Sequence, residues 1–123
     1  MRTLIPVLAT FTAIIFGVTA VAAARHGYLW PATFIADLAT LDWRAQFNSD
    51  LLMHLLLLGA WVSWREGFTL RGHLFGSFCV VWGGMFSFPY LLYAYHAGSG
   101  DLTRVLLGVH ADTAPGQAVK AAT

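Results

Sequence analysis

Three apolar runs divide the chain, and each is long enough to form a helix that crosses a membrane. They cover residues 4–24, 47–64 and 72–95. At a rise of 1.5 Å per residue the first run is about 31 Å long as a helix, close to the thickness of the hydrocarbon core of a bilayer. Arg2 and Arg25 bracket this run and would lie outside the core. The pattern predicts an all-α integral membrane protein with three transmembrane helices.

The first run has a second interpretation, as a cleaved signal peptide. It ends in Ala22, Ala23 and Ala24, and it follows a basic start, which fits the cleavage pattern of such peptides. The run is nevertheless longer than the roughly 7–15 apolar residues of a signal peptide. We therefore expect the helix to be retained.

An amphipathic helix is predicted over residues 31–42, between the first and second runs. Its apolar residues recur at helical spacing, at Phe34, Ile35, Leu38 and Leu41. Asp37 and Asp42 face elsewhere, and Trp30 and Trp43 flank the segment, as indoles do at a membrane interface. We expect an interfacial helix here; the alternative is a loop folded back over the other helices.

The second and third runs are separated only by the short polar turn from Arg65 to Arg71, which predicts an antiparallel hairpin. Pro89 lies inside the third run and predicts a bend near Phe88 and Pro89. We assign residues 1–98 to the membrane domain. The tail over residues 99–123, rich in small residues towards its end, is expected to be disordered.

The composition supports a chain surrounded by lipid. Of the 123 residues 58% are hydrophobic and only 11% are charged, whereas a soluble domain would carry about a quarter charged residues. A formal net charge of +1 without a basic stripe excludes nucleic acid as an expected partner. The lone Cys79 lies in an apolar run and is expected to serve packing. The expected location is a membrane, with several crossings.

A ridge of small side chains runs along one face of the third run. It consists of Gly72, Gly76, Cys79, Gly83 and Ser87, which we call the small-residue ridge. Small residues let two helices approach closely in lipid, where packing replaces the hydrophobic drive. The ridge therefore indicates either a homo-oligomer or a membrane complex, or packing against another helix of the same chain.

Asp50 and His54 stand one turn apart on the second run and could share a hydrogen bond. Ionisable residues inside a membrane are costly, and a carboxylate that orients an imidazole is typical of acid–base chemistry. These two are the candidate catalytic residues. The alternative is that Asp50 opens a helix at headgroup level and that a neighbour satisfies a buried His54.

Three crossings would place two groups of polar residues on opposite sides of the membrane. The first loop would share its side with a possible ligand cluster of His26, Asp50, His54, Tyr93, Tyr95 and His96. The other side would hold Arg65, Glu66, Arg71 and His73. Imidazoles from two helices could bind a metal or haem iron, but the chain has no paired metal motif, so no cofactor is expected. The two arginines of the tight turn favour a cytoplasmic amino terminus.

The chain resembles, between residues 47 and 95, a family of small bacterial and cyanobacterial membrane proteins catalogued as a domain of unknown function. The matching positions are Asn48, Asp50, Leu51, Leu52, Trp64, Glu66, Gly83, Gly84 and the stretch from Pro89 to Tyr93. Tyr90 departs from the pattern, which has leucine after the proline. The resemblance implies three helices and a bacterial inner membrane, and it implies no activity.

Two hypotheses on function follow. The first is a non-enzymatic membrane subunit or scaffold that associates through the small-residue ridge. The second is a compact enzyme or binding protein for an isoprenoid or lipid-like ligand, with Asp50 and His54 as acid–base groups, and with haem or metal binding as a further alternative. Glu66 lies at the other end of the same helix, about 24 Å from Asp50, so the two cannot serve one reaction centre.

Overall fold

The computed structural model describes residues 3–113, which form six α-helices and one 3₁₀-helix. The elements are α1 (Leu4–His26), α2 (Trp30–Ala39), α3 (Trp43–Arg65), α4 (Leu70–Trp82), α5 (Gly84–Ala97), α6 (Leu102–Leu107) and η1 (Gly108–Thr113). No strand occurs within this range. The all-α class expected from the apolar pattern is confirmed.

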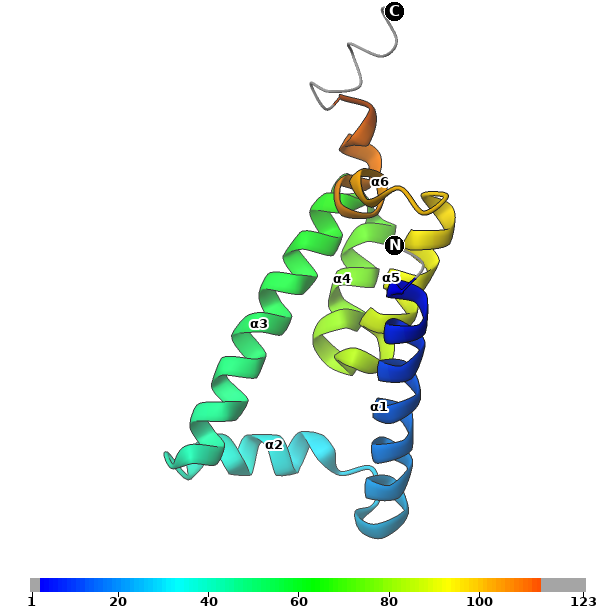
Figure 1. The fold of residues 1–123 in the computed structure, drawn as a ribbon. Coiled ribbons are helices and arrows are strands. Elements are labelled where there is room, and N and C mark those ends of the chain that lie inside the picture. Colours follow the sequence, from blue (N-terminus) through cyan, green and yellow to red (C-terminus); the bar gives the residue numbers. More distant parts are fainter. Residues whose placement is uncertain (1–2, 114–123) are drawn as a thin grey trace, which may run out of the picture.

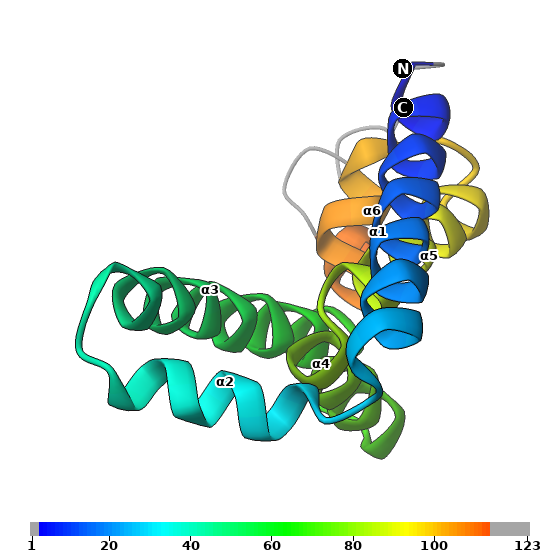
Figure 2. The same ribbon diagram turned by 90° about the horizontal axis from the view of Figure 1, so that it is seen from below.

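Two long helices frame the molecule, and shorter ones fill the space between them. In Figure 1, α1 and α3 extend over most of its height, α2 joins their lower ends, and α4 and α5 lie between their upper halves. The view from below in Figure 2 shows α2 running beside α3 towards the end of α1. The turn between α3 and α4, the start of α1 and the short helix α6 all lie at the same upper end.

Only α1 among the described helices is both long and apolar enough to cross a membrane. It is 23 residues long and buries only Leu8. The α3 helix has the same length but carries Asn48, Asp50 and His54 in its first half. With 13 and 14 residues, α4 and α5 are each too short to cross a membrane alone. The prediction of three transmembrane helices is therefore not confirmed.

The third run does not form one helix over residues 72–95. It forms two, and the chain reverses at Gly83, which has a positive φ of 55° that L-residues with a side chain rarely adopt. Pro89 lies within α5, so the expected bend near Phe88 and Pro89 is replaced by a sharper break six residues earlier. The reason is that a glycine with positive φ can turn the chain back, whereas Pro89, the sixth residue of α5, removes one hydrogen bond but does not end the helix.

Ring contacts show that α4 and α5 run antiparallel. Phe75 meets Tyr90 with ring centroids 5.7 Å apart, and Phe78 meets Phe86 at 5.4 Å. Residues farther before Gly83 thus contact residues farther after it, as in an antiparallel pair. Phe11 of α1 contacts Phe88 at 5.6 Å, which places α1 against α5. The hairpin therefore has α3 on one side and α1 on the other (Figure 1).

The small-residue ridge is used inside the chain, where α4 packs against α3. Gly72, Gly76 and Cys79 are buried. A Cβ atom on Gly76 would collide with the carbonyl oxygen of Gly59 and would lie 2.6 Å from Ser63 Oγ. Ser63 also donates a hydrogen bond to the carbonyl of Gly72. Of the two interpretations of the ridge, the structure therefore supports packing against the chain's own helix. The remaining members are Gly83, at the reversal, and Ser87, buried in α5.

The tail expected to be disordered from residue 99 forms a turn and then two short helices over residues 102–113. We call residues 102–113, which comprise α6 and η1, the C-terminal cap. Val105 and Ala111 are buried, because α6 packs against α5 and η1 packs against α3. The composition of the tail did not predict this packing, because hydrogen bonds to backbone carbonyls of the cap contribute to it. Residues 114–123 lie outside the described part of the chain.

The opposite end of the molecule is organised by Asp42, the N-cap of α3. Its carboxylate accepts hydrogen bonds from the Thr40 hydroxyl at 2.6 Å and from the amide of Arg44 at 2.9 Å. The hydrogen bond from Thr40 is the main cause that lowers the pKa of Asp42 to about 2. Arg44 also pairs with Asp37 of α2, at 3.4 Å. A helix is present where one was expected over residues 31–42, but it ends at Ala39, and Leu41 lies beyond it with a positive φ of 52°. The apolar Ile35 of α2 is exposed.

Candidate functional site

The proposed catalytic pair, Asp50 and His54, lies exposed on α3. His54 Nδ1 is 2.8 Å from the carbonyl oxygen of Asp50 and 3.5 Å from its carboxylate. The side chains are 70% and 60% exposed for His54 and Asp50 respectively. His54 is therefore not the buried donor that was expected. Neither residue lines the polar or the apolar cavity found in the structure, so the pair does not lie in an enclosed site.

The possible ligand cluster is divided between two ends of the molecule. His26 and Asp50 belong to the end near α2 and His54 lies at the middle of α3, whereas the others, Tyr93, Tyr95 and His96, lie at the far end of α5 (Figure 1). The reversal at Gly83 is the reason, because it returns α5 to the end where α4 began. In residues 3–113 no group of three or more His, Cys, Asp or Glu side chains could hold a metal ion.

Arg65, at the end of α3, holds the C-terminal cap. Its Nε donates to the carbonyl of Val105 at 2.6 Å, and Nη2 donates to the carbonyl of Arg104 at 3.3 Å. Both carbonyls belong to the last turn of α6, the end of a helix that attracts cations, and the carbonyl of Arg104 also accepts from the amide of Gly108. Two further residues in the last turns of α3 complete the contact. The indole of Trp61 donates to the carbonyl of Leu106, and the backbone carbonyl of Trp64 accepts from His110 Nε2.

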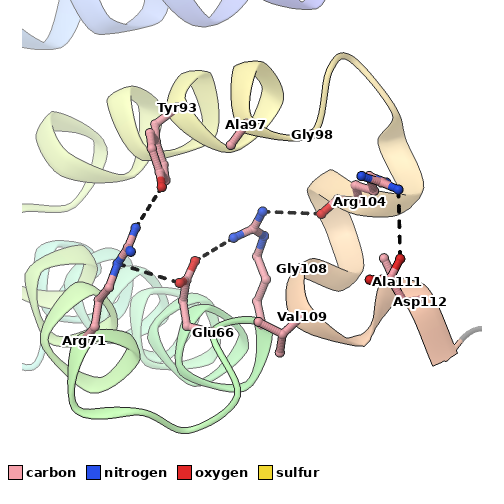
Figure 3. A pocket seen from close by; sticks show the side chains of 11 residues that line it. Glu66, Arg71, Tyr93, Ala97, Gly98, Arg104, Gly108, Val109, Ala111 and Asp112 are labelled. Carbon is pink, nitrogen blue, oxygen red and sulfur yellow. Dashed lines mark hydrogen bonds and ion pairs between the residues drawn. The ribbon is translucent and has the colours of Figure 1, made fainter.

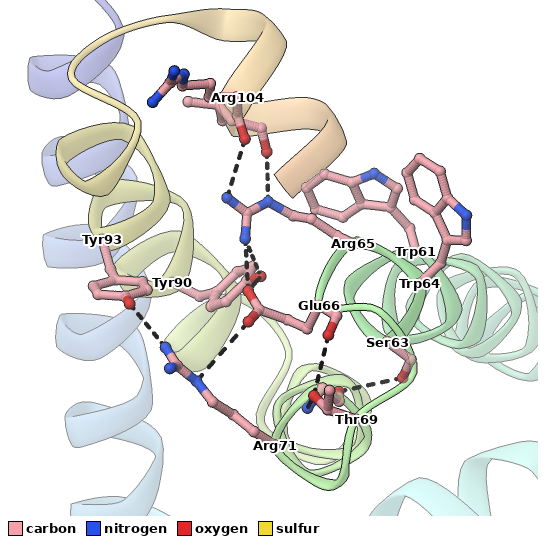
Figure 4. Close-up of polar contacts among 12 residues, drawn as sticks. Trp61, Ser63, Trp64, Arg65, Glu66, Thr69, Arg71, Tyr90, Tyr93 and Arg104 are labelled. Carbon is pink, nitrogen blue, oxygen red and sulfur yellow. Dashed lines mark hydrogen bonds and ion pairs between the residues drawn. The ribbon is translucent and has the colours of Figure 1, made fainter. Parts of the chain in front are cut away.

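Glu66 is the counter-ion at the centre of this network (Figure 4). Its Oε1 accepts from Arg65 Nη1 at 2.6 Å and from the Tyr90 hydroxyl at 2.6 Å. Tyr90 accepts in turn from Arg65 at 2.8 Å. The side chains of Arg65 and Glu66 are only 8% and 13% exposed. Buried charges of this kind persist when they are paired and hydrogen-bonded, so this part of the site is an internal support.

Arg71 extends the network from α4 to α5. Its Nη2 donates to the Tyr93 hydroxyl at 2.8 Å, and its guanidinium lies 5.0 Å from the ring centre of Phe75. The other oxygen of Glu66, Oε2, is 3.9 Å from Arg71 Nε, which is too long for a hydrogen bond. Arg71 is therefore held in place by rings while its charge is only partly neutralised.

A cavity of about 260 Å³ opens beside these residues (Figure 3). Its lining combines α3, α4, α5 and the C-terminal cap, through Arg65, Glu66, Arg71, Tyr93, Ala97, Gly98, Arg104, Gly108, Val109, Ala111 and Asp112. We call it the polar cavity. Three arginines and two carboxylates line it, which leaves one positive charge in excess.

Arg71 and Arg104 are the two lining arginines that a ligand can reach. Their side chains are 55% and 54% exposed, and Arg104 meets Asp112 only at 3.9 Å. Arginine presents several N–H donors in a planar fork that matches phosphate and carboxylate groups. The polar cavity can therefore bind an anion.

Sequence reasoning placed Tyr93 and Arg71 on opposite sides of the membrane, and the structure joins them by a hydrogen bond. The cause is again the reversal at Gly83. A signal for it was present, because the consecutive glycines Gly83 and Gly84 interrupt the third run near its middle, and paired glycines often mark turns. The role of Arg104 had no such signal, since it depends on how the C-terminal cap docks.

Comparison of the chain with family models, with curated proteins and with solved structures finds no match. The site must therefore be interpreted from its own geometry.

Proposed function

We propose that this chain is a small multi-pass integral membrane protein that binds a phosphate-bearing ligand in the polar cavity at the membrane surface. The observation that carries the proposal is that one cavity at the end of the helices is lined by both Arg71 and Arg104, whose side chains are more than half exposed. The hypothesis of a scaffold that associates through the small-residue ridge loses its main support, because α3 occupies the ridge.

The distribution of apolar side chains supports the membrane part of the proposal. Large apolar residues are exposed along α1, α3 and α4, for example Phe11, Leu57 and Phe78. Soluble monomers rarely expose apolar surface over such continuous areas. The core is small, centred on Val62, Cys79 and Tyr90. A chain of this kind suits lipid as its solvent.

In the arrangement that we propose, α1 and α3 cross the bilayer, α2 lies at one interface, and the hairpin of α4 and α5 enters from the other side and returns. Both α4 and α5 need partners on their flanks, which α3 and α1 supply. The C-terminal cap then shares its side with the turn between α3 and α4. Arg65, Arg71 and Arg104 gather on that side, which favours a cytoplasmic location for it.

Cysteine labelling tests this arrangement. In a Cys79→Ala background, single cysteines are introduced by Tyr28→Cys, Phe68→Cys and Val109→Cys, at three exposed positions. We expect an impermeant maleimide to label positions 68 and 109 from the same side of sealed vesicles and position 28 from the other. Labelling of position 109 together with position 28 would mean that α4 and α5 cross the membrane as one unit, and the returning hairpin would be wrong.

Ligand binding is tested by thermal unfolding of the purified protein in a neutral detergent. We expect inorganic phosphate, glycerol phosphate and phosphatidylglycerol to raise the melting temperature, and phosphatidylcholine to raise it less. The double variant Arg71→Met, Arg104→Met should remove the shift, because it removes both exposed guanidinium groups. A shift with phosphatidylglycerol alone would identify a lipid as the source of the phosphate.

The matched control is Arg44→Met, which removes an exposed arginine at the opposite end of the molecule. This variant should keep the full response to phosphate. Salt screens the attraction between a phosphate and exposed arginines. Raising the ionic strength should therefore weaken the response of the unmodified protein to phosphate. A phosphate response that survives the double variant, or no response at all, would overturn the proposed function.

A further inference from the structure

The outer face of α3 carries a regular stripe of side chains. Trp43, Phe47, Asp50, His54 and Leu57 follow one another at alternating steps of four and three residues. We call these five residues the outer seam. This heptad spacing aligns side chains along one face, and it is typical of helices that pair in a left-handed coiled coil. The spacing therefore indicates a face that fits a second helix.

The outer seam is uncovered in the described part of the chain. Trp43, Phe47 and Leu57 are between 70% and 78% exposed. The buried residues Ala45 and Gly59 lie on the opposite side of the helix, where α2 and α4 pack. In Figure 1, α1, α2, α4 and α5 all lie on the same side of α3. A second helix can therefore reach the outer seam without displacing any of these four.

Two residues of the outer seam are ionisable, and one of them lies at the middle of the helix. His54 is eleven residues from Trp43 and eleven from Arg65, which are the two ends of α3. In the membrane arrangement proposed above, His54 thus lies near the centre of the bilayer, and Asp50 lies one turn closer to the interface. Ionisable side chains at such depth are costly when they face lipid, and they normally face protein or water. Lipid is therefore a poor neighbour for this face.

The pair of Asp50 and His54 is complementary to a copy of itself. His54 Nδ1 lies 2.8 Å from the carbonyl oxygen of Asp50, and this contact leaves Nε2 for a second partner. In a parallel coiled coil, a side chain at position 50 enters a hole that includes position 54 of the facing helix. A two-fold axis beside α3 thus brings Asp50 of each copy to His54 of the other, and two equivalent pairs form at once.

We infer that the outer seam is a homodimer interface in which α3 helices of two copies pair in parallel, with Asp50 of each copy against His54 of the other. Phe47 and Leu57 pack on either side of this pair. The C-terminal cap contacts α3 from Trp61 onwards, so the two helices cross near His54 and diverge towards the caps. The inference rests on the membrane arrangement that we propose and is independent of the phosphate site.

The polar pair sets the size of the expected effect. One polar contact between membrane helices changes their association by about threefold to tenfold. Because a dimer contains two equivalent pairs, their loss should weaken association by about tenfold to a hundredfold. Both side chains are exposed in the monomer, so substitutions of Asp50 and His54 should leave its melting temperature unchanged.

Cross-linking of single cysteines in lipid vesicles locates the interface. In the full chain with Cys79→Ala, Leu57→Cys and Phe47→Cys place a thiol on the outer seam. Leu56→Cys is the matched control, because Leu56 is also more than half exposed and lies at nearly the same depth as Leu57, on another face of α3. We expect copper phenanthroline to link both seam variants into disulfide-bonded dimers and to leave the control mostly monomeric. Equal linking of all three variants, or linking of none, would overturn the inference.

Exchange of the two charges tests the polar pair. Association is measured in vesicles of increasing lipid content, by energy transfer between donor and acceptor dyes on Tyr28→Cys in the Cys79→Ala chain. We expect His54→Asp, which gathers four carboxylates at the interface, to weaken association by at least about tenfold. The exchanged variant Asp50→His, His54→Asp restores two complementary pairs and should recover most of the association. Association that ignores His54→Asp, or that the exchange does not recover, contradicts the pairing.

The failure of this inference can be told apart from the failure of the proposed function. The exchanged variant should keep the full response to phosphate, because neither Asp50 nor His54 lines the polar cavity. A chain whose labelling at positions 28, 68 and 109 follows the proposed arrangement, but which stays monomeric, would overturn the dimer alone; lipid or another protein would then cover the outer seam. Labelling that contradicts the arrangement would overturn both.

Discussion

Replacing Gly76 by leucine is expected to lower the stability of the monomer by about 3 kcal/mol or more. Even the Cβ atom would collide with the carbonyl of Gly59, which belongs to a helix backbone and cannot rotate away. Helix α4 must then move off α3 and give up the hydrogen bond from Ser63 to Gly72. Thermal unfolding in detergent, followed by circular dichroism, measures the loss.

Gly17 provides the matched control for Gly76. It also lies inside a helix, but a Cβ atom there would have no atom within 4 Å. Gly17→Ala should be neutral or stabilise by up to about 1 kcal/mol through helix propensity, whereas Gly76→Ala should destabilise. If Gly76→Leu left the monomer as stable as Gly17→Leu and only dissociated an oligomer, the ridge would face a partner chain after all.

Replacing Arg65 by methionine is expected to cost about 3–5 kcal/mol and to release the C-terminal cap. Methionine keeps much of the apolar stem but leaves the Glu66 carboxylate buried without its closest cation. It also removes the donors to the carbonyls of Arg104 and Val105. Thermal unfolding measures the stability, and limited proteolysis between Gly98 and Asp101 reports the release of the cap.

Two comparisons identify the buried charge as the cause. Arg44→Met removes a guanidinium that is 65% exposed, and it should cost no more than about 1 kcal/mol. Adding Glu66→Gln to Arg65→Met should recover part of the loss, because no uncompensated carboxylate remains. Equal stability of Arg65→Met and Arg44→Met would show that the network around Glu66 does not hold the cap.

The helices could be predicted from the sequence because each depends on a local pattern. The first two apolar runs and the amphipathic segment near Phe34 each correspond to one helix, and the short polar turn after Arg65 separates α3 from α4. The direction of residues 84–97 could not be predicted with the same rules. A proline and a pair of glycines competed as the point of bending, and the positive φ of Gly83 decided it.

The site depends on distant contacts, which periodicity does not record. Asp50 and His54 attracted attention because their spacing suits a hydrogen bond within one helix, yet they lie on an exposed face. The polar cavity combines residues from both ends of the turn at Glu66 with Tyr93 and Arg104. Arg65 donates to backbone carbonyl oxygens of the cap. Every residue has such a carbonyl, so the sequence does not indicate which ones will accept the hydrogen bonds.

The contact between α1 and α5 determines the order in which the molecule can be completed during synthesis. The hairpin of α3 and α4 is local and can close as soon as residue 82 has left the ribosome. Phe11, by contrast, must wait for Phe88, which is made much later. Until then α1 lacks the partner for its apolar surface, and in the membrane arrangement that we propose the bilayer surrounds it. The first helix to be made is therefore among the last to reach its final neighbours.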